Sequence, residues 1–187
     1  MLNKTIAFGI ITLFLFSLFS FAQEKEKEYK YVGSKKCKTC HNAEKNGAQY
    51  KLWESKKHSK AYETLKSENG KKKAEKLGVK DYLTNEECTS CHAPGFGKKN
   101  VDKSFSHEEG VGCETCHGPG SEYKTMKVMK DRKLSLAAGL IVPDEKTCKT
   151  CHKKDTPEHT IEFTTFEKEY AKIAHPVPPE NDRRVKK

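Results

Sequence analysis

The sequence predicts a mainly α-helical protein whose core is built around bound groups more than around its own side chains. Three observations lead to this prediction. All eight cysteines fall in four copies of one short motif, helix signals recur without a β pattern of note, and the 187-residue chain is 33% charged and 34% hydrophobic. A chain of this composition is expected to have difficulty burying a core of its own.

The repeated motif is Cys-x-x-Cys-His, the signature for attachment of c-type haem. Two thiols bond to one porphyrin, and the adjacent histidine becomes the proximal ligand of the iron. The four copies comprise Cys37, Cys40 and His41; Cys88, Cys91 and His92; Cys113, Cys116 and His117; and Cys148, Cys151 and His152. We therefore predict four covalently attached haem c groups.

Paired cysteines also occur in zinc sites and in redox disulfides. Zinc does not explain a histidine directly after every second cysteine, and a disulfide needs no histidine, so haem is the favoured interpretation. Porphyrins are large, flat and apolar, and they would supply the missing core. We therefore expect a small multihaem cytochrome, with helices and loops wrapped around four closely packed haems, and an apo chain that is largely unfolded.

The amino terminus is typical of a secretory signal peptide. Lys4 precedes an apolar run from Ile6 to Phe21, and the small-x-small sequence Ser20-Phe21-Ala22 follows as a cleavage site. Export agrees with c-type haem, which bacteria attach outside the cytoplasm. The alternative is an uncleaved anchor, although the run is somewhat short for a membrane span of roughly 20 residues.

These signals divide the chain into three parts. We predict a signal peptide at 1–22, a tetrahaem cytochrome c domain at 23–175 and a polar, disordered tail at 176–187. The expected location is the periplasm, with the cell exterior as the alternative. Membrane contact would then be limited to an uncleaved signal anchor.

The formal net charge of +10 falls to +9 once the predicted signal, which holds only Lys4, is removed. Such an excess often marks a polyanion-binding surface. Here the propionates of four haems offset most of it, and no basic motif interleaved with aromatic residues is present. The sequence therefore argues against nucleic acid as a partner and favours acidic redox proteins.

In chain order, Ser34 is placed to cap a helix entering the first motif. Residues 44–67 have a helical pattern that ends near Gly70, with Tyr62 and Leu65 on the same face as His58. Residues 71–77 form a short basic helix in this prediction.

Further along, Thr84 and Glu87 have the spacing of a capping box ahead of the second motif. Asp144 is a suitable cap ahead of the fourth. Residues 165–174 have a helical stripe that Pro176 ends. Because the second and third motifs start only 25 residues apart, at Cys88 and Cys113, their haems are expected to lie close together.

Several stretches resemble the tetrahaem cytochrome c-554 family of nitrifying bacteria. They are Tyr31-Val32-Gly33-Ser34 before the first motif, Trp53 with His58 and Ala61, Gly95-Phe96-Gly97, and the run from Gly110 to Gly120 around the third motif. The resemblance covers the predicted mature chain up to His175. It implies a mainly helical scaffold, haems in stacked and perpendicular pairs, and transfer of electrons in the periplasm.

The resemblance also implies distal iron ligands. His58 matches the ligand of the fourth haem and His175 that of the third, while the family's second haem is five-coordinate. The family's first haem takes a histidine shortly after the third motif, but residues 121–129 contain none. Met129, or Met126, could replace it, and the alternative that both only pack on porphyrin stays open.

Two histidines have no assigned role. His107 could ligate the second or the first haem, and His159 lies in a polar loop that predicts a surface position.

The leading functional prediction is a relay of single electrons between redox partners, because no catalytic group is evident apart from the haems. One alternative is a reductase of a small ligand such as nitric oxide at a five-coordinate second haem. Another is a subunit of a conductive filament, with a spare histidine such as His159 or His107 donated between subunits. The sequence identifies neither the donor nor the acceptor.

Overall fold

The computed structural model describes residues 28–152 and 165–175. Within these ranges the chain is mainly helical, as predicted, and contains no β-strand; a single parallel bridge joins Tyr31 to Val101. The predicted signal peptide at 1–22, the tail at 176–187 and His159 lie outside the described residues.

Thirteen short helices make up the described part of the chain, and most are only one or two turns long. The first seven are α2 (Ser34–His41), η2 (Glu44–Asn46), α3 (Gln49–Glu54), η3 (Lys57–Lys60), α4 (Ala61–Lys66), α5 (Glu68–Lys76) and α6 (Glu86–His92). The remaining six are η4 (His107–Glu109), α7 (Cys113–His117), α8 (Met126–Met129), α9 (Arg132–Ala137), α10 (Glu145–Lys149) and α11 (Phe166–Ile173).

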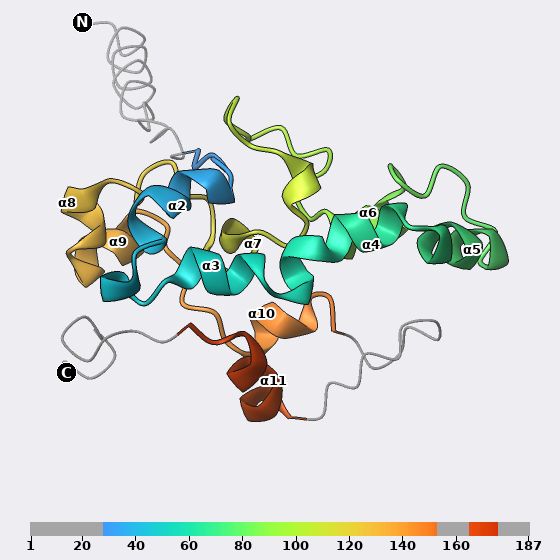
Figure 1. The fold of residues 1–187 in the computed structure, drawn as a ribbon. Helices are drawn as coiled ribbons and strands as arrows, with labels where there is room; N and C mark the ends of the chain where they lie inside the picture. The colour runs from blue at the N-terminus through green and yellow to red at the C-terminus, as the bar shows by residue number, and fades with distance from the viewer. Residues whose placement is uncertain (1–27, 153–164, 176–187) are drawn as a thin grey trace, which may run out of the picture.

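Figure 1 shows an elongated arrangement of these helices. α8 and α9 lie at one end near α2, and α5 lies at the opposite end beyond α4 and α6. α3 and α7 occupy the middle, and α10 and α11 lie together along one side. The motif helices α2, α6, α7 and α10 are therefore spread through the molecule between the two ends.

Two of the three predicted helix caps are wrong. The cap of α2 is Gly33, and Ser34 is already the first helical residue, because its backbone N–H and its hydroxyl are both bonded to the Glu109 carboxylate. The cap of α6 is Asn85, whose side chain accepts from the Glu87 N–H, so Thr84 lies one residue too early.

The third prediction is confirmed. Asp144 caps α10 in a reciprocal capping box with Thr147.

The predicted helix at 44–67 is broken into η2, α3, η3 and α4, and Gly70 lies inside α5 instead of ending a helix. The breaks coincide with backbone that a continuous helix cannot contain: Ala48 has a left-handed φ of 46°, and Lys56 is extended. The basic helix predicted at 71–77 exists as α5, and the helix predicted at 165–174 exists as α11. Helices α8 and α9 were not anticipated.

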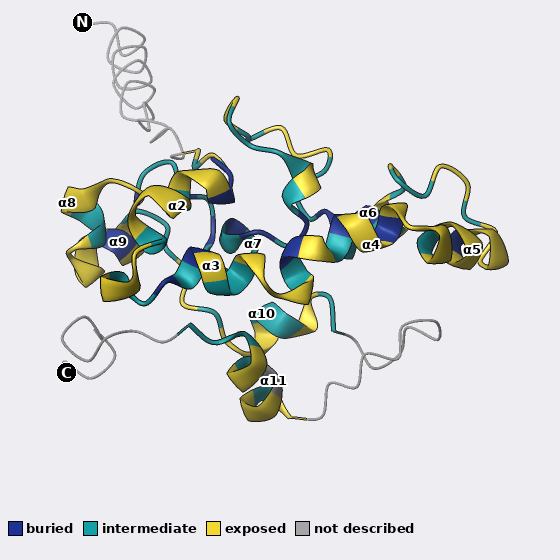
Figure 2. Ribbon diagram, viewed as in Figure 1, coloured by how far each residue is buried: buried dark blue, intermediate teal, exposed yellow. Residues whose placement is uncertain are grey.

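The protein-only core is small. Eight apolar residues are buried in the described part of the chain, and three of them are alanines: Val32, Ala48, Tyr50, Tyr62, Leu65, Ala74, Ala93 and Tyr123. Figure 2 shows the buried residues, polar ones included, as short dark-blue segments amid exposed and half-buried helix surface. Burial of a large apolar side chain contributes only about 1.5–3 kcal/mol, so this set alone is a weak basis for a fold of this length.

A buried carboxylate joins two distant segments of the chain. Glu114, in α7, is 2% exposed and accepts from the backbone N–H groups of Val32 (2.9 Å), Gly33 (2.6 Å) and Gly120. Charged acceptors form the stronger hydrogen bonds in proteins. Glu114 therefore fixes the entry to the first motif directly against the third motif.

Glu109 reinforces the same junction. Its carboxylate accepts from the Ser34 N–H at 2.7 Å and from the Ser34 hydroxyl, which in turn accepts from the Cys113 N–H at 2.8 Å. Burial raises the pKa of Glu109, while its bonds to Ser34 act in the opposite direction. The starts of α2 and α7 are thus held together through one shared hydroxyl.

Replacing Glu114 with alanine should destabilise the protein strongly, because it leaves three backbone N–H donors without acceptors. A buried donor without a partner costs about 1–3 kcal/mol, so the total should be roughly 3 kcal/mol or more. The measurement is the denaturation midpoint of the haem-loaded protein in guanidinium chloride. The matched control is Glu108→Ala, which removes only an exposed ion pair to Lys66 at 3.7 Å and should cost at most about 1 kcal/mol. Equal midpoints for the two variants would contradict this role of Glu114.

Candidate functional site

Each Cys-x-x-Cys-His motif lies on or directly after a helical turn. The first three motifs end α2, α6 and α7 at their histidines, and in the fourth Cys148 lies in α10 while Cys151 and His152 follow it. Residues at i, i+3 and i+4 share one face of a helix. Both thiols and the imidazole of each motif therefore point to the same side, as attachment to one flat group requires.

Three of the motif histidines are held by an oxygen at Nδ1. The distances are 2.9 Å from His92 to the Ala61 carbonyl, 3.1 Å from His117 to the Ile141 carbonyl, and 3.3 Å from His41 to the Gln49 amide oxygen. Because a carbonyl oxygen can only accept, Nδ1 carries the proton and Nε2 is left with its lone pair. This is the arrangement of a histidine prepared to ligate a metal through Nε2.

The motifs contact one another through their cysteines. Cys37 and Cys113 share a thiol–thiol hydrogen bond that raises the pKa of Cys37 and lowers that of Cys113. A second such bond, between Cys91 and Cys151, raises the pKa of Cys151. The first motif therefore adjoins the third, and the second adjoins the fourth.

The two pairs also influence each other electrostatically. Burial, and after it the nearby Cys148 thiol, raise the pKa of Cys116 to about 11. The sequence predicts that the second and third haems lie close together, and α6 and α7, which carry these two motifs, border one cavity.

His58 faces the histidine of the fourth motif. The ring centres of His58 and His152 lie 6.0 Å apart at an interplanar angle of 66°. Burial, and then the nearby His152, lower the pKa of His58. Since a metal–imidazole bond is about 2 Å long, two rings bound on opposite sides of one ion have their centres roughly 6 Å apart. This pair therefore has the spacing of two axial ligands.

His175 lies among the histidines of the first and third motifs. Burial, followed by the neighbouring rings of His117 and His41, lowers its pKa to about 4. Its buried Nδ1 has no hydrogen-bonding partner in the part of the chain that the structure describes. A buried polar atom in this condition calls for a further polar group or ligand close to the His175 ring.

The segment after the third motif differs from what the sequence suggested. Met126 is 62% exposed, and Met129 is half-buried at the end of α8. The residue buried here is Tyr123, whose hydroxyl donates to the Gly118 carbonyl at 2.6 Å. Burial, then Glu114, Cys37 and Cys113, raise its pKa. Tyr123 therefore fills the space beside the first and third motifs, a role that its spacing alone did not signal.

His107 packs among aromatic rings. It meets Tyr62 edge-on at 5.3 Å and Phe96 at 4.9 Å between ring centres. These contacts place it against the cluster of Tyr62, Leu65 and Ala93. Its suggested role as a ligand of the second or first haem stays a prediction without support from these contacts.

The donor arrangement fits haem better than zinc. Structural zinc needs four convergent ligands, yet in the described residues no three or more His, Cys, Asp or Glu side chains converge in that way. All eight cysteines, which lie in described residues, are free thiols. Instead, the pairs of thiols, each with an adjacent histidine, are spaced along a chain that buries few apolar side chains. This arrangement fits the attachment of four separate flat groups.

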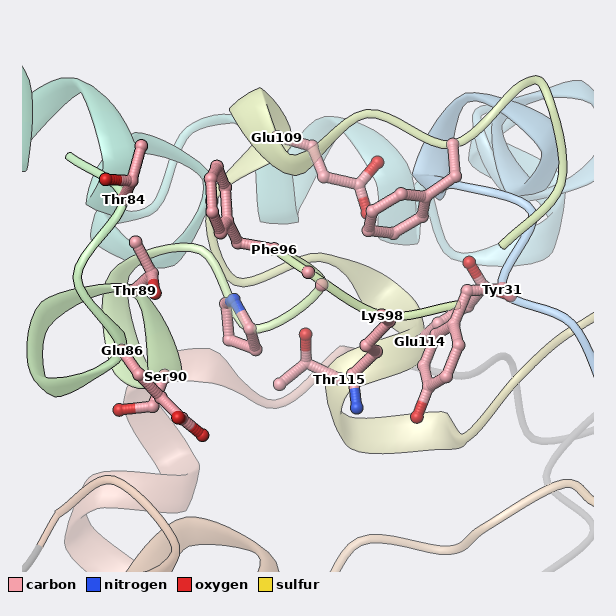
Figure 3. Close-up of a pocket in the computed structure, with 15 residues that line it drawn as sticks. Tyr31, Thr84, Glu86, Thr89, Ser90, Phe96, Lys98, Glu109, Glu114 and Thr115 are labelled. Carbon is pink, nitrogen blue, oxygen red and sulfur yellow. The ribbon is translucent and has the colours of Figure 1, made fainter. Parts of the chain in front are cut away.

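A cavity of about 610 Å³ lies between α6 and α7 (Figure 3). Its lining includes the residues between the cysteines of two motifs: Thr89, Ser90, Glu114 and Thr115. No cysteine or histidine lines it. Because these residues lie on the opposite helix face from the thiols, the cavity is behind the attachment sites and not part of them.

Comparison with known proteins gives two matches. Residues 36–118 match the family described as cytochrome c554 and c-prime. Cytochrome c-554 of Nitrosomonas europaea is 37% identical over 125 residues, which are 64% of this chain and 51% of that protein, so the chain spans about half the length of this relative. No solved structure gives a significant match. The resemblance to the cytochrome c-554 family is thereby confirmed.

Replacing His58 with alanine should leave the fourth haem attached, because Cys148, Cys151 and His152 are unchanged. Only the distal bond is lost, so the oxidised protein should gain one high-spin haem in its absorption and electron paramagnetic resonance spectra. The control is Lys57→Ala, which changes an exposed residue of the same turn and should leave the spin states unchanged. A His58→Ala variant that stays as fully low-spin as the parent would contradict the assignment.

Proposed function

We propose, from its similarity to the cytochrome c-554 family, that this chain is an exported tetrahaem cytochrome that relays single electrons between redox proteins. The observation that carries the proposal is the close approach of the four motifs to one another. The first adjoins the third where the Ser34 hydroxyl accepts from the Cys113 N–H, the second adjoins the fourth where the Cys91 and Cys151 thiols interact, and the second and third border one cavity. Attachment sites this close together are the arrangement expected of a carrier that passes electrons from one haem to the next.

Haem, when bound, supplies reversible one-electron chemistry at iron. The residues of the chain fix where that chemistry takes place. The four cysteine pairs hold the groups covalently, and the motif histidines provide one axial ligand each. His58 and His175 are the proposed distal ligands at the fourth and third sites. Ligation by two imidazoles at the third and fourth sites would favour transfer of electrons without binding of substrate.

Glu114 and Glu109 are proposed to set the spacing between the first and third sites. Both carboxylates bridge α2 and α7, so they keep the first and third sites in register. Their bonds are to backbone and to Ser34, which move little, so the spacing is preorganised before any partner binds.

Export to the periplasm is part of the proposal and rests on the sequence at 1–22 and on the chemistry of c-type haem. Among residues 28–152 and 165–175, no helix has both the length and the apolar character needed to cross a membrane.

The proposal requires four haems in each mature chain. After expression with c-type maturation and export, the intact mass should exceed that of the polypeptide starting near Gln23 by four haem masses. The variant Cys88→Ala with Cys91→Ala should lower this excess by one haem. An excess of three or fewer in fully matured parent protein would contradict the proposal.

The distal ligand of the first haem is proposed to be Met129. Met126 is the matched control, because it lies on the same short helix and is largely exposed. The oxidised parent should show the weak near-infrared band of sulfur–iron ligation. Met129→Leu preserves most of the volume and should abolish the band, whereas Met126→Leu should not. If the parent lacks the band, methionine ligation is excluded and His107 becomes the leading candidate.

A further inference from the structure

The end of the molecule formed by α5 and the turn after it carries a cluster of lysines. Residues 66–81 contain six lysines against Glu68, Glu75 and Asp81, a net charge of +3 over sixteen residues. All six lysines are exposed: Lys66, Lys71, Lys72, Lys73, Lys76 and Lys80. We call these residues the α5 lobe.

The lysines of α5 are not distributed evenly around the helix. Ala74 is the buried residue of α5 and marks the face that packs against the protein. At 100° per residue, Lys72 and Lys76 project on the side opposite Ala74, and Lys73 flanks them. The outward face of α5 is therefore cationic, whereas Glu68 and Glu75 lie nearer its edge.

The α5 lobe is adjacent to the second motif. α5 and α6 both pack against α4. Tyr82 and Leu83, in the turn that leaves the lobe, pack with Cys88 against the buried cluster of Tyr62, Leu65 and Ala93. Figure 1 shows α5 at the extreme end of the molecule, next to α6. The lobe thus borders the second motif.

We propose that the α5 lobe is the docking surface for an acidic redox protein that exchanges electrons with the chain at the second haem site. This inference rests on the proposed relay function, since it assigns a partner surface to one end of that relay. Charge complementarity defines the partner, because a cationic face attracts a protein with an anionic face. Such attraction raises the association rate constant by about 10-fold to 1,000-fold at low salt.

The test uses the haem-loaded mature protein and, as the probe, a reduced acidic plant-type [2Fe–2S] ferredoxin. Stopped-flow absorbance gives the second-order rate constant for haem reduction as a function of ionic strength. The test variant combines Lys72→Glu and Lys76→Glu. The control variant combines Lys99→Glu and Lys103→Glu, which makes the same change in charge on two exposed lysines outside the α5 lobe. Carbodiimide cross-linking of the parent to the probe, read by mass spectrometry, locates the contact independently of any rate.

At low salt, the α5 variant should lose at least about tenfold in rate and most of the salt dependence, while the control should lose less than about threefold. Cross-links should form at Lys72, Lys73 or Lys76. Equal losses in both variants, or cross-links confined to other lysines, would overturn the docking surface. Dithionite, a small reductant that needs no docking, should reduce parent and variants alike. Failure of dithionite to reduce the parent would instead overturn the relay function on which the inference rests.

Discussion

The constraint on which this structure depends is that two thiols and one imidazole must reach the same flat, rigid group. Five consecutive residues meet this requirement when they form a helical turn, because positions i, i+3 and i+4 share a face. The motif helices α2, α6, α7 and α10 all begin or end within a few residues of a motif. The shortness of the helices follows from the same constraint, since the chain must redirect itself between attachment sites.

The small buried set of apolar residues indicates how the fold is stabilised. What holds the described chain together besides packing is directional: the bonds of Glu114 and Glu109 to backbone and Ser34, and the carbonyls that fix His92 and His117. Such bonds fix the positions of the groups that they join, but each contributes only modestly to the net free energy of folding. Attached porphyrins would provide the apolar surface, and the hydrogen bonds would specify how the attachment sites are spaced. Stability and function therefore depend on the same contacts.

Much of this could be predicted from the sequence, and the limits have physical causes. The four motifs, the helical character, α5, α11 and the Asp144 cap are local signals carried by neighbouring residues. The caps assigned to Ser34 and Thr84 were wrong because Glu109, 75 residues from Ser34, competes for its hydroxyl, and because Asn85 is the better-placed acceptor. The neighbours of each motif are set by long-range contacts such as Glu114 to Val32, which leave no periodic pattern. Glu114 itself is one of the two variable letters of its motif, so nothing local marked it as buried.

The central claim is that the haems are the core of this protein and that the chain cannot form its fold without them. The most direct measurement is the thermal unfolding of the chain produced without haem attachment, followed by far-ultraviolet and near-ultraviolet circular dichroism beside the loaded protein. We expect the haem-free chain to have weak helical signal, no near-ultraviolet signal from fixed aromatic packing and no cooperative transition. A haem-free chain that melts cooperatively from a folded state with the helix content of the loaded protein would contradict this account.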